Sequence, residues 1–421
     1  MVQNEALGYW PESILPSLQD SANVVSWGGE VYNSETGGRH TSTQMGSGHF
    51  PSEGLGKASY FRNLQYLAKP GKFVDPQGLI TYATKPLCYN GDGGDVIDCI
   101  DIYKQPALSH PLLKNHTIQL NPPSLFPNGT NESSHQDDEV LQSWLLNEEC
   151  PEGTIPILRT QAFNSSTPKS SPPFNGSDVE FTPASGHEYA ITNLLDGQYY
   201  GAHAFLNVWS PLSVSGEISI SQIWVVGDRD QARNKQTRFF IFWTGHGYKD
   251  GCYNLQCPGF VQVNRKFALG LPIKPVSTYN GKQVEIFISI YKHQSTGQWW
   301  RLTLQDQALG YWPDKILPSL RGSLDTISWG GEIFNSEAEG HHTSLTSTQM
   351  GSGHFPSEGY GKASYFRNIQ YLASSGKFVD AQGLINYVTK PPCYNLIMNN
   401  KAPGFGTHFY YGGSGYSARC P

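Results

Sequence analysis

One long stretch of sequence occurs twice in this chain, once near its start and once near its end. Residues 7–90 return as residues 309–395, with one three-residue insertion. Solenoids and propellers repeat a short unit several times, so a single long repeat is typical of neither architecture. The second copy runs on to Pro421, whereas the first stops at residue 90. We therefore expect residues 1–90 to be a partial copy, the C-terminal half only, of the domain that ends the chain.

Composition and the spacing of apolar residues favour strands over helices. The chain has 45 glycines and 28 prolines, and both residue types interrupt helices and mark turns. In residues 284–291, Val and Ile alternate with other residues, which is the period of a strand with one buried face. Further short apolar runs, separated by Gly and Pro, follow one another from residue 187 onward. We expect an all-β fold there, an antiparallel β-sandwich over residues 187–421.

A small separate block precedes the expected sandwich. Cys99 and Cys150 bracket residues 96–160, and a disulfide between them would close a small domain. Two unrelated thiols are the less favoured alternative. Residues 161–186 are rich in Ser, Pro, Asn and Gly and hold few apolar residues, which is typical of an extended linker that is open to proteolysis.

The cysteines and the glycosylation sequons indicate a secreted protein. Cys252 and Cys257 lie in CYNLQC, where a disulfide in a tight turn is favoured over a metal site because no second close Cys/His pair accompanies them. Sequons cluster in one segment, at Asn115, Asn128, Asn131, Asn164 and Asn175. The first residues do not show the basic-then-apolar pattern of a signal peptide. We therefore expect a secreted protein whose leader is absent from this sequence.

Charge and motif content exclude several classes of function. The net charge is −6 and Lys and Arg form no cluster, so we expect no nucleic-acid partner. No apolar run approaches the ~18 residues of a membrane helix, so we expect no membrane span. The sequence lacks a serine-hydrolase elbow, a His-Glu-x-x-His zinc motif, a phosphate loop and a dinucleotide fingerprint. We therefore expect no cofactor and no catalytic metal.

Glu332 is the candidate catalytic residue. It follows Gly330 and Gly331 in a strand-like run and lies close to Trp329. Glycine inside a strand marks a bulge or a close approach by another backbone. A carboxyl group beside an indole can be shielded from water and take part in acid–base chemistry. The alternative, an ordinary glutamate on an edge strand, is favoured when these residues are considered alone.

Several longer motifs resemble the plant neprosin family. DCIDIYKQPALSHPLLKNHTIQ and CPEGTIPILRT are similar to its activation domain, and GAHAFLNVW, CYNLQCPGFVQVN, SWGGEIFNS and STQMGSGHFPSEG are similar to its catalytic domain. The resemblance covers residues 96–160 and 187–421, and residues 7–90 a second time. It is specific, because many separate motifs occur in the expected order.

The resemblance implies a fold, an activity and a substrate. Members of this family are secreted plant proteins in which a β-sandwich follows an inhibitory pro-segment, and the founding member is a glutamic endopeptidase that cuts after proline at acid pH. The implied partner is a proline-containing peptide. The implied chemistry uses two glutamates, one as general base and one as protonated acid. We also expect a third disulfide, Cys393–Cys420, with Cys88 unpaired because the first copy lacks an equivalent of Cys420.

Only one of the two family glutamates is matched. The second falls on Glu332 and, in the partial copy, on Glu30. The first lies in an Ile-Glu-Ala-Gly-Trp strand between an SQIW strand and a TRFF strand. Here the two flanking motifs are joined by GDRDQARNKQ, residues 227–236, which holds Asp228 and Asp230 but no glutamate. The resemblance thus implies a peptidase that is impaired in this chain. The alternative is a non-catalytic β-sandwich homologue that binds cell-wall polymer through exposed aromatic residues.

Overall fold

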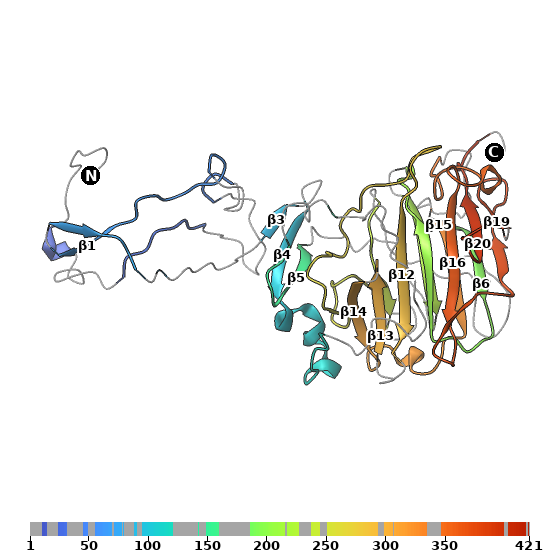
Figure 1. Cartoon of the computed structure of the whole chain (residues 1–421), viewed down its shortest axis with the longest axis horizontal. Helices are drawn as coiled ribbons and strands as arrows, with labels where there is room; N and C mark the ends of the chain where they lie inside the picture. The colour runs from blue at the N-terminus through green and yellow to red at the C-terminus, as the bar shows by residue number, and fades with distance from the viewer. Residues whose placement is uncertain are drawn as a thin grey trace. The chain divides into compact units, whose positions relative to one another are not determined.

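A computed structural model of the chain describes residues 11–14, 24–31, 45–48, 55–69, 71–77, 79, 88–90, 95–120, 142, 149–159, 186–214, 217–226, 237–244, 251–293, 299–305, 307–334, 347–399, 403–417 and 420. The chain divides into two compact units, Met1–Thr84 and Lys85–Pro421. Figure 1 labels the elements of both units.

The first unit contains little regular structure where it is described. Its elements there are a 3-10 helix, η1 (Glu12–Ile14), and an antiparallel hairpin of β1 (Tyr66–Lys69) and β2 (Lys72–Val74). Large apolar side chains are exposed, among them Leu55 at 84% and Phe61 at 62%. A two-stranded hairpin is marginally stable by itself. In its described part, the partial copy therefore does not form the sheets that the complete copy forms in the second unit.

The smaller of the two main sheets in the second unit has the strand order β18–β6–β15–β8. Its strands are β6 (His187–Leu194), β8 (Ile218–Val226), β15 (Thr326–Phe334) and β18 (Ile385–Val388). Every pairing is antiparallel, and β15 is paired with both β6 and β8 along nearly its whole length. The strand that carries Glu332 is thus held on both edges.

The larger sheet has nine strands in the order β11–β14–β13–β12–β7–β16–β20–β19, with β17 paired to β16. Its strands are β7 (Gly201–Asn207), β11 (Val261–Gln262), β12 (Glu285–Lys292), β13 (Trp299–Leu304), β14 (Gln307–Pro313), β16 (Ser364–Leu372), β17 (Phe378–Asp380), β19 (Asn395–Asn399) and β20 (His408–Gly412). The labelled strands of the two sheets run roughly along one direction (Figure 1).

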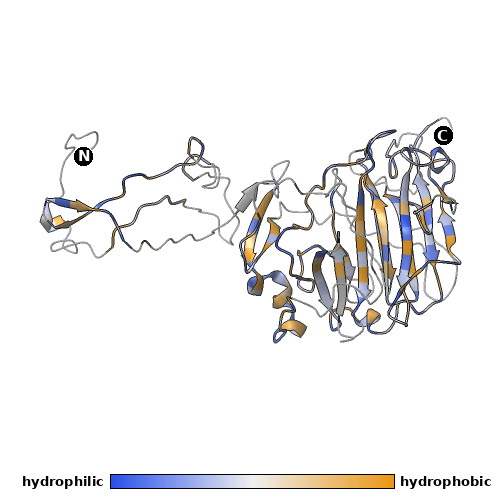
Figure 2. Ribbon diagram, in the orientation of Figure 1, coloured by the Kyte–Doolittle hydropathy of each residue, from blue (hydrophilic) through white to orange (hydrophobic). Residues whose placement is uncertain are grey.

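An apolar core fills the space between these sheets. β15 contributes Trp329 and Ile333, and the larger sheet contributes Ile286 of β12 and Phe366 of β16. Figure 2 shows apolar residues recurring along the strands as orange bands. The prediction of an all-β antiparallel sandwich is confirmed, since the regular elements of the described segments are strands and short 3-10 helices.

β12 departs from the sequence pattern in one respect. Alternation predicts a single buried face, and Ile286 and Ile288 do lie in the core. The opposite face is buried as well, with Phe287 at 6% exposure and Ser289 at 0%. Aromatic rings of neighbouring strands pack on this outer face, where the ring centroids of Phe205 on β7 and Phe287 lie 4.9 Å apart. Such a layer depends on which strands become neighbours, and the alternation within one strand does not contain that information.

The segment before the sandwich forms a small sheet and three short helices. They are β3 (Cys88–Asn90), β4 (Val96–Asp101), β5 (Thr154–Arg159), η5 (Ile102–Lys104), η6 (Pro106–Ser109) and η7 (Pro111–Leu113). The three strands pair in the order β3–β4–β5, and both pairings are antiparallel.

This segment packs on the β11–β14 end of the larger sheet. The side chain of Gln105 exchanges two hydrogen bonds with the backbone of Gln262 on β11, at 3.1 and 2.8 Å. The hydroxyl of Tyr311 on β14 lies 2.8 Å from His116 Nε2 and accepts a hydrogen bond from the backbone N–H of Gln119 at 3.0 Å. The segment is therefore anchored on the sheet that does not carry Glu332.

Three disulfide bonds close loops of the second unit. They join Cys99 to Cys150, Cys252 to Cys257 and Cys393 to Cys420, with Cα–Cα distances of 5.6, 5.8 and 4.8 Å. These distances are normal for disulfides, and the pairings are those that the sequence led us to expect. Cys252 lies in β10 (Gly251–Tyr253), which pairs with β9 (Phe242–Thr244), so the CYNLQC stretch is a disulfide-closed turn. The side chain of Cys88 lies outside the described part of the structure.

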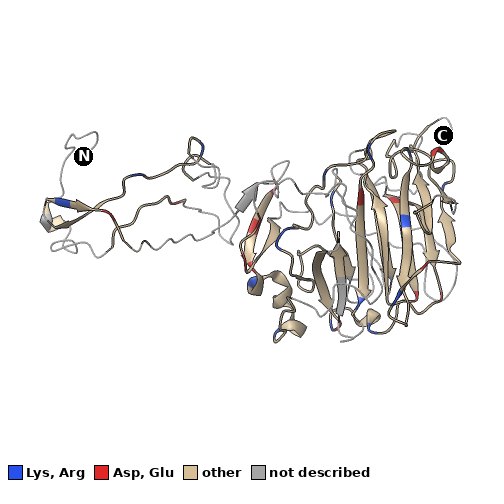
Figure 3. Ribbon diagram, in the orientation of Figure 1, with Lys and Arg blue, Asp and Glu red and all other residues tan. Residues whose placement is uncertain are grey.

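Acidic and basic residues are interspersed in the described part of the second unit. Figure 3 shows both kinds distributed over its strands and loops. Asn115 is exposed, as a glycan acceptor must be; Asn128, Asn131, Asn164 and Asn175 lie outside the described residues. Among the residues that the structure describes, no helix is long and apolar enough to cross a membrane.

Candidate active site

Glu332 lies on β15 with its side chain on the outer face of the smaller sheet. Its neighbour Ile333 is part of the core between the sheets, and side chains alternate between the two faces of a strand. Glu332 is directly opposite Tyr189 of β6 and Ile220 of β8. Only 1% of Glu332 is exposed to solvent. A buried carboxyl group needs polar partners, because an unpaired one would be costly.

Two side chains from the flanking strands provide those partners. Nδ1 of His187, on β6, lies 2.6 Å from Oε1 of Glu332, and Nε2 of Gln222, on β8, donates to Oε2 at 2.5 Å. Each partner lies two positions along its strand from the residue directly opposite Glu332, so all three side chains share one face. Both oxygens of the carboxyl group are therefore held in place, one from each side.

The surroundings of this polar cluster are apolar. Phe334, Ile218 and Ile220 form a small buried cluster, against which Phe240 packs. The ring of His187 lies 4.6 Å from that of Phe334 between centroids. Hydrogen bonds and charges act more strongly in such a setting than in water. The site thus combines a carboxyl group that is fixed by hydrogen bonds with low solvent access.

The two glycines before Glu332 are needed for close packing. Gly330 has a φ of 149°, and a Cβ atom there would lie 2.3 Å from the carbonyl oxygen of Ala190 on β6. A Cβ atom on Gly331 would lie 2.7 Å from Sδ of Met350, on the core side. Of the two possibilities given by the sequence, Gly330 marks a close approach by another backbone. β15 and β6 stay in register through this position.

The copy of this glutamate in the first unit has a different environment. Ser-Trp-Gly-Gly-Glu also ends at Glu30, but residues 24–31 form no strand and Glu30 is exposed. The same five residues therefore produce a buried carboxyl group only where β6 and β8 flank them. The environment of Glu332 is a property of the assembled sheet and not of the local sequence.

Glu217 and Glu285 are the nearest glutamates on either side of residues 227–236 in the sequence. Neither of them can act with Glu332. Glu217 directly precedes β8. Because side chains alternate between the two faces of a strand, Glu217 lies on the inner face with Ser219 and Ser221. Gln222 lies on the outer face with Glu332. The carboxylate of Glu217 accepts a hydrogen bond from Thr348 Oγ1. Glu217 therefore points to the opposite side of the sheet from Glu332.

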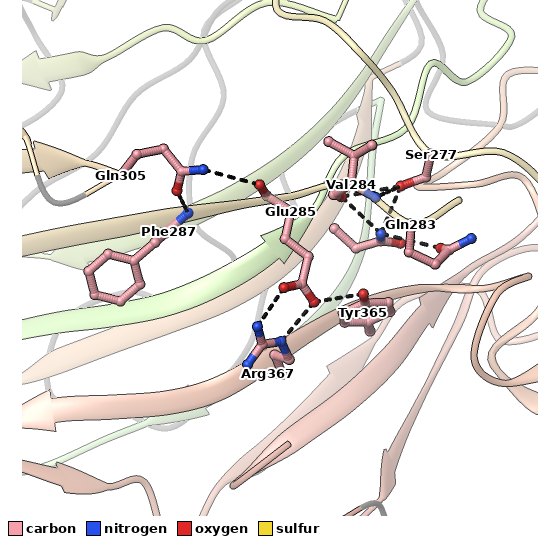
Figure 4. A network of polar contacts seen from close by, with 9 residues as sticks. Ser277, Gln283, Val284, Glu285, Phe287, Gln305, Tyr365 and Arg367 are labelled. Carbon is pink, nitrogen blue, oxygen red and sulfur yellow. Dashed lines mark hydrogen bonds and ion pairs between the residues drawn. The ribbon is translucent and has the colours of Figure 1, made fainter. Parts of the chain in front are cut away.

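Glu285 belongs to a different polar network, on the larger sheet. It lies on β12 in the larger sheet, where Nε and Nη2 of Arg367 donate to its two oxygens at 2.7 and 2.6 Å. The hydroxyl of Tyr365 donates to the same carboxylate at 2.7 Å (Figure 4). The guanidinium group also stacks over the ring of Phe205, 3.9 Å from its centroid. This network joins β12 to β16, and it is not part of the Glu332 site.

One edge of the smaller sheet, as far as the structure describes it, is β8. β8 pairs with β15 on one edge, and it has no second partner among the described strands. A strand joined to β8 by a short hairpin would occupy that edge. Asp228 and Asp230 lie in the loop that follows β8 and fall outside the described residues.

The sequence did not lead us to His187 or Gln222. Both residues lie in stretches that the sequence pattern assigns to the sandwich. Gln222 belongs to SQIW, and His187 opens HEYAI at the start of the sandwich. Period-two counting places Gln222 on the same face as Ile218 and Ile220. What the pattern lacks is the register between β15 and its neighbours, which decides whether these side chains reach Glu332.

The fold and site together define an all-β protein in which a disulfide-closed segment precedes a sandwich with a buried glutamate. Comparison with protein families gives the same picture. The family model described as Neprosin matches residues 1–98 and 212–414, and the model described as Neprosin activation peptide matches residues 89–193. The chain therefore belongs to the neprosin family and carries the activation peptide of that family.

The end of the activation-peptide match lies inside the sandwich. Residues 89–193 include nearly all of β6, which pairs with both β15 and β18. His187 thus comes from this matched segment, whereas Gln222 and Glu332 come from the Neprosin match. The contact between His187 and Glu332 joins the two matched regions.

Proposed function

We infer that this chain is the zymogen of a secreted acid endopeptidase that cuts proline-containing peptides, with Glu332 as one of its two catalytic carboxyl groups. We also infer that its activity is impaired, because the family glutamate expected after SQIW has no counterpart between Glu217 and Glu285. One observation carries the proposal: Glu332 is 1% exposed and both of its oxygens are held by side chains of flanking strands. Family membership and the disulfides support secretion.

The proposed chemistry assigns Glu332 the role of general base. Its carboxylate takes a proton from a water molecule as that water attacks the carbonyl carbon of the substrate peptide bond. His187 and Gln222 keep the carboxylate in a fixed orientation, and the low solvent access strengthens its interactions. The second carboxyl group would donate a hydrogen bond to the carbonyl oxygen. Its loss leaves the base in place but weakens the stabilisation of the developing negative charge.

A zymogen would keep this site closed until it is processed. Glu332 is closed to solvent in the full chain, and the chain carries the activation peptide. The described part of that segment docks on β11 and β14, in the other sheet. Residues 161–186 join that segment to the strand that carries His187, and we expect cleavage there to accompany activation.

The test is a cleavage assay at about pH 4, with an acid-processed chain and a peptide that contains one proline. We compare the unmodified chain with Glu332→Gln and with Glu30→Gln, the matched change in the exposed copy of the same motif. Slow cleavage after proline should be lost in Glu332→Gln and kept in Glu30→Gln. Cleavage that survives Glu332→Gln would contradict the assignment.

A second candidate function, binding of cell-wall polymer, rests on two exposed tyrosines. Tyr279 is 44% exposed and Tyr360 is 59% exposed. Their loops are joined by a hydrogen bond from the backbone N–H of Asn280 to the carbonyl oxygen of Gly361, at 2.8 Å. Exposed aromatic rings beside polar groups can contact sugar rings, although the ring of His354 already packs on Tyr279, 4.2 Å away between centroids. Binding of the Glu332→Gln chain to insoluble β-glucan, reduced by Tyr279→Ala with Tyr360→Ala, would favour this function.

A further inference from the structure

We propose that Gln222 is a catalytic residue, and that its side-chain amide donates a hydrogen bond to the carbonyl oxygen of the peptide bond that is cut. Gln222 and Glu332 would then be the reacting pair of the chain as it stands. This inference rests on the proposed function and deepens it, because it names a group that can partly replace the missing carboxyl group.

The amide of Gln222 lies beside the carboxylate that would activate the water. Nε2 of Gln222 lies 2.5 Å from Oε2 of Glu332. A primary amide carries two N–H donors, and the contact with Glu332 uses one of them. A carbonyl oxygen bound to the second N–H would lie close to the carboxylate that activates the water. Glu332 as base and the amide of Gln222 as oxyanion donor would thus both lie next to the carbonyl carbon that the water attacks. Acyl transfer to water requires this arrangement.

Gln222 is also more accessible to solvent than Glu332. Gln222 is half-buried on β8, whereas Glu332 lies one strand further in and is 1% exposed. Among the described strands, β8 is the edge of the smaller sheet. A substrate that approaches from this edge meets the amide of Gln222 before the carboxylate. An edge strand also offers backbone groups that can hold an extended peptide.

The reaction balances without any further reactant. The water oxygen forms a bond to the carbonyl carbon while its proton passes to Glu332. The electron pair of the C=O double bond moves to the oxygen, which accepts the hydrogen bond from Gln222. The C=O double bond then re-forms, the C–N bond breaks, and the proton on Glu332 passes to the leaving nitrogen. The products are a carboxylic acid and an amine, and Glu332 is again a carboxylate.

An amide and a carboxylic acid differ in a way that can be measured. The amide of Gln222 does not titrate, so it donates at every pH in the working range. A glutamate at the same position donates only when it is protonated, and it repels Glu332 when it is ionised. Gln222→Glu should therefore convert a donor that is independent of pH into one that is lost as the pH rises.

The experiment measures kcat and KM for a single-proline peptide between about pH 3 and 7, with the processed full chain. The variants are Gln222→Leu and Gln222→Glu. The control is Gln370→Leu, because Gln370 also donates to a carboxylate, Asp380, at 2.7 Å but lies on the other sheet. Removal of one oxyanion donor typically lowers kcat by about 10²–10³-fold. We expect that loss in Gln222→Leu with little change in KM, no loss in Gln370→Leu, and activity confined to the acid end in Gln222→Glu.

Several outcomes would overturn the inference. It is wrong if Gln222→Leu keeps its kcat, or if Gln222→Glu follows the pH profile of the unmodified chain; the second arm remains decisive if the leucine variant does not fold. It is also wrong if the unmodified chain is inactive while a chain with a grafted Ile-Glu-Ala-Gly-Trp strand cleaves, and the proposed function then stands. If neither chain cleaves, the proposed function itself fails.

Discussion

His187 and Glu332 form a buried polar pair across β6 and β15, with Nδ1 of the histidine 2.6 Å from Oε1 of the glutamate and 1% of each side chain exposed. The histidine lies in the region that matches the activation peptide, and the glutamate lies in the region that matches Neprosin. The site therefore depends on β6, and dividing the chain at residue 193, where the activation-peptide match ends, would remove nearly all of this strand from the sandwich.

Replacing His187 should destabilise the sandwich. His187→Leu leaves one oxygen of a buried carboxyl group without this partner, and an unsatisfied buried polar group costs about 1–3 kcal/mol. His187→Gln keeps a donor at a similar reach and should cost less. Urea unfolding of the two variants measures the difference. Equal free energies of unfolding for both variants and the parent would show that the contact contributes nothing to stability.

Processing should occur before His187. β6 pairs with β15 and β18, so a cut within or after it would remove a paired strand from the smaller sheet. Acid incubation of the secreted chain, followed by N-terminal sequencing, should find new termini within residues 161–186. An active product that begins after Leu194 would contradict this expectation.

Gly330→Ala should be strongly destabilising. The new Cβ atom would lie 2.3 Å from the carbonyl oxygen of Ala190, and the φ of 149° is a conformation that residues with a side chain rarely adopt. We expect a loss of about 3 kcal/mol or more in the free energy of unfolding. Gly28 is the matched control in the first copy, since a Cβ atom there meets nothing within 4 Å. Similar losses for the two variants would show that the packing around Gly330 is not the cause.

Acid should weaken the fold through His203. Burial lowers the pKa of His203 from 6.5 to about 3, and the nearby side chain of Gln370 opposes this in part. Between these values the unfolded chain binds a proton that the folded chain does not, so the free energy of unfolding falls as the pH drops. The contribution between pH 7 and 4 is about 3 kcal/mol. His203→Leu should reduce the stability difference between those two pH values by that amount, as measured by urea unfolding. An unchanged difference would mean that other groups cause the acid sensitivity.

The sequence predicts the class of fold and one residue of the site. Alternating Ile residues in β12 and in β8 predict strands, because one face of each strand is apolar; in β12 that face lies in the core between the sheets, and in β8 it is the outer face that Ile218 and Ile220 share with Glu332. The outer aromatic layer that covers Phe287 is not predicted, because it depends on which strands become neighbours. Glu332 is found through a resemblance to a family motif, but Glu30 carries the same motif and is exposed. Burial at Glu332 comes from β6 and β8, which are distant in sequence.

The partners of Glu332 could not be predicted for a related reason. His187 and Gln222 reach it only in the register that pairs Tyr189 and Ile220 with Glu332. A shift of one residue in either pairing would turn the partner to the other face of the sheet. Register is set by the packing of whole strands, and a single sequence does not specify it.

The most direct test of the account is whether a second carboxyl group completes the site. The chain is made with an Ile-Glu-Ala-Gly-Trp strand in place of residues 227–236, where it can pair with the edge of β8, and again with Glu332→Gln added. kcat/KM for a proline-containing peptide at about pH 4 is measured for both and for the unmodified chain. We predict that the graft cleaves about 10²–10⁴-fold faster than the unmodified chain, and that Glu332→Gln abolishes the gain. A folded graft that cleaves no faster than the unmodified chain, or one that is indifferent to Glu332→Gln, would contradict the account.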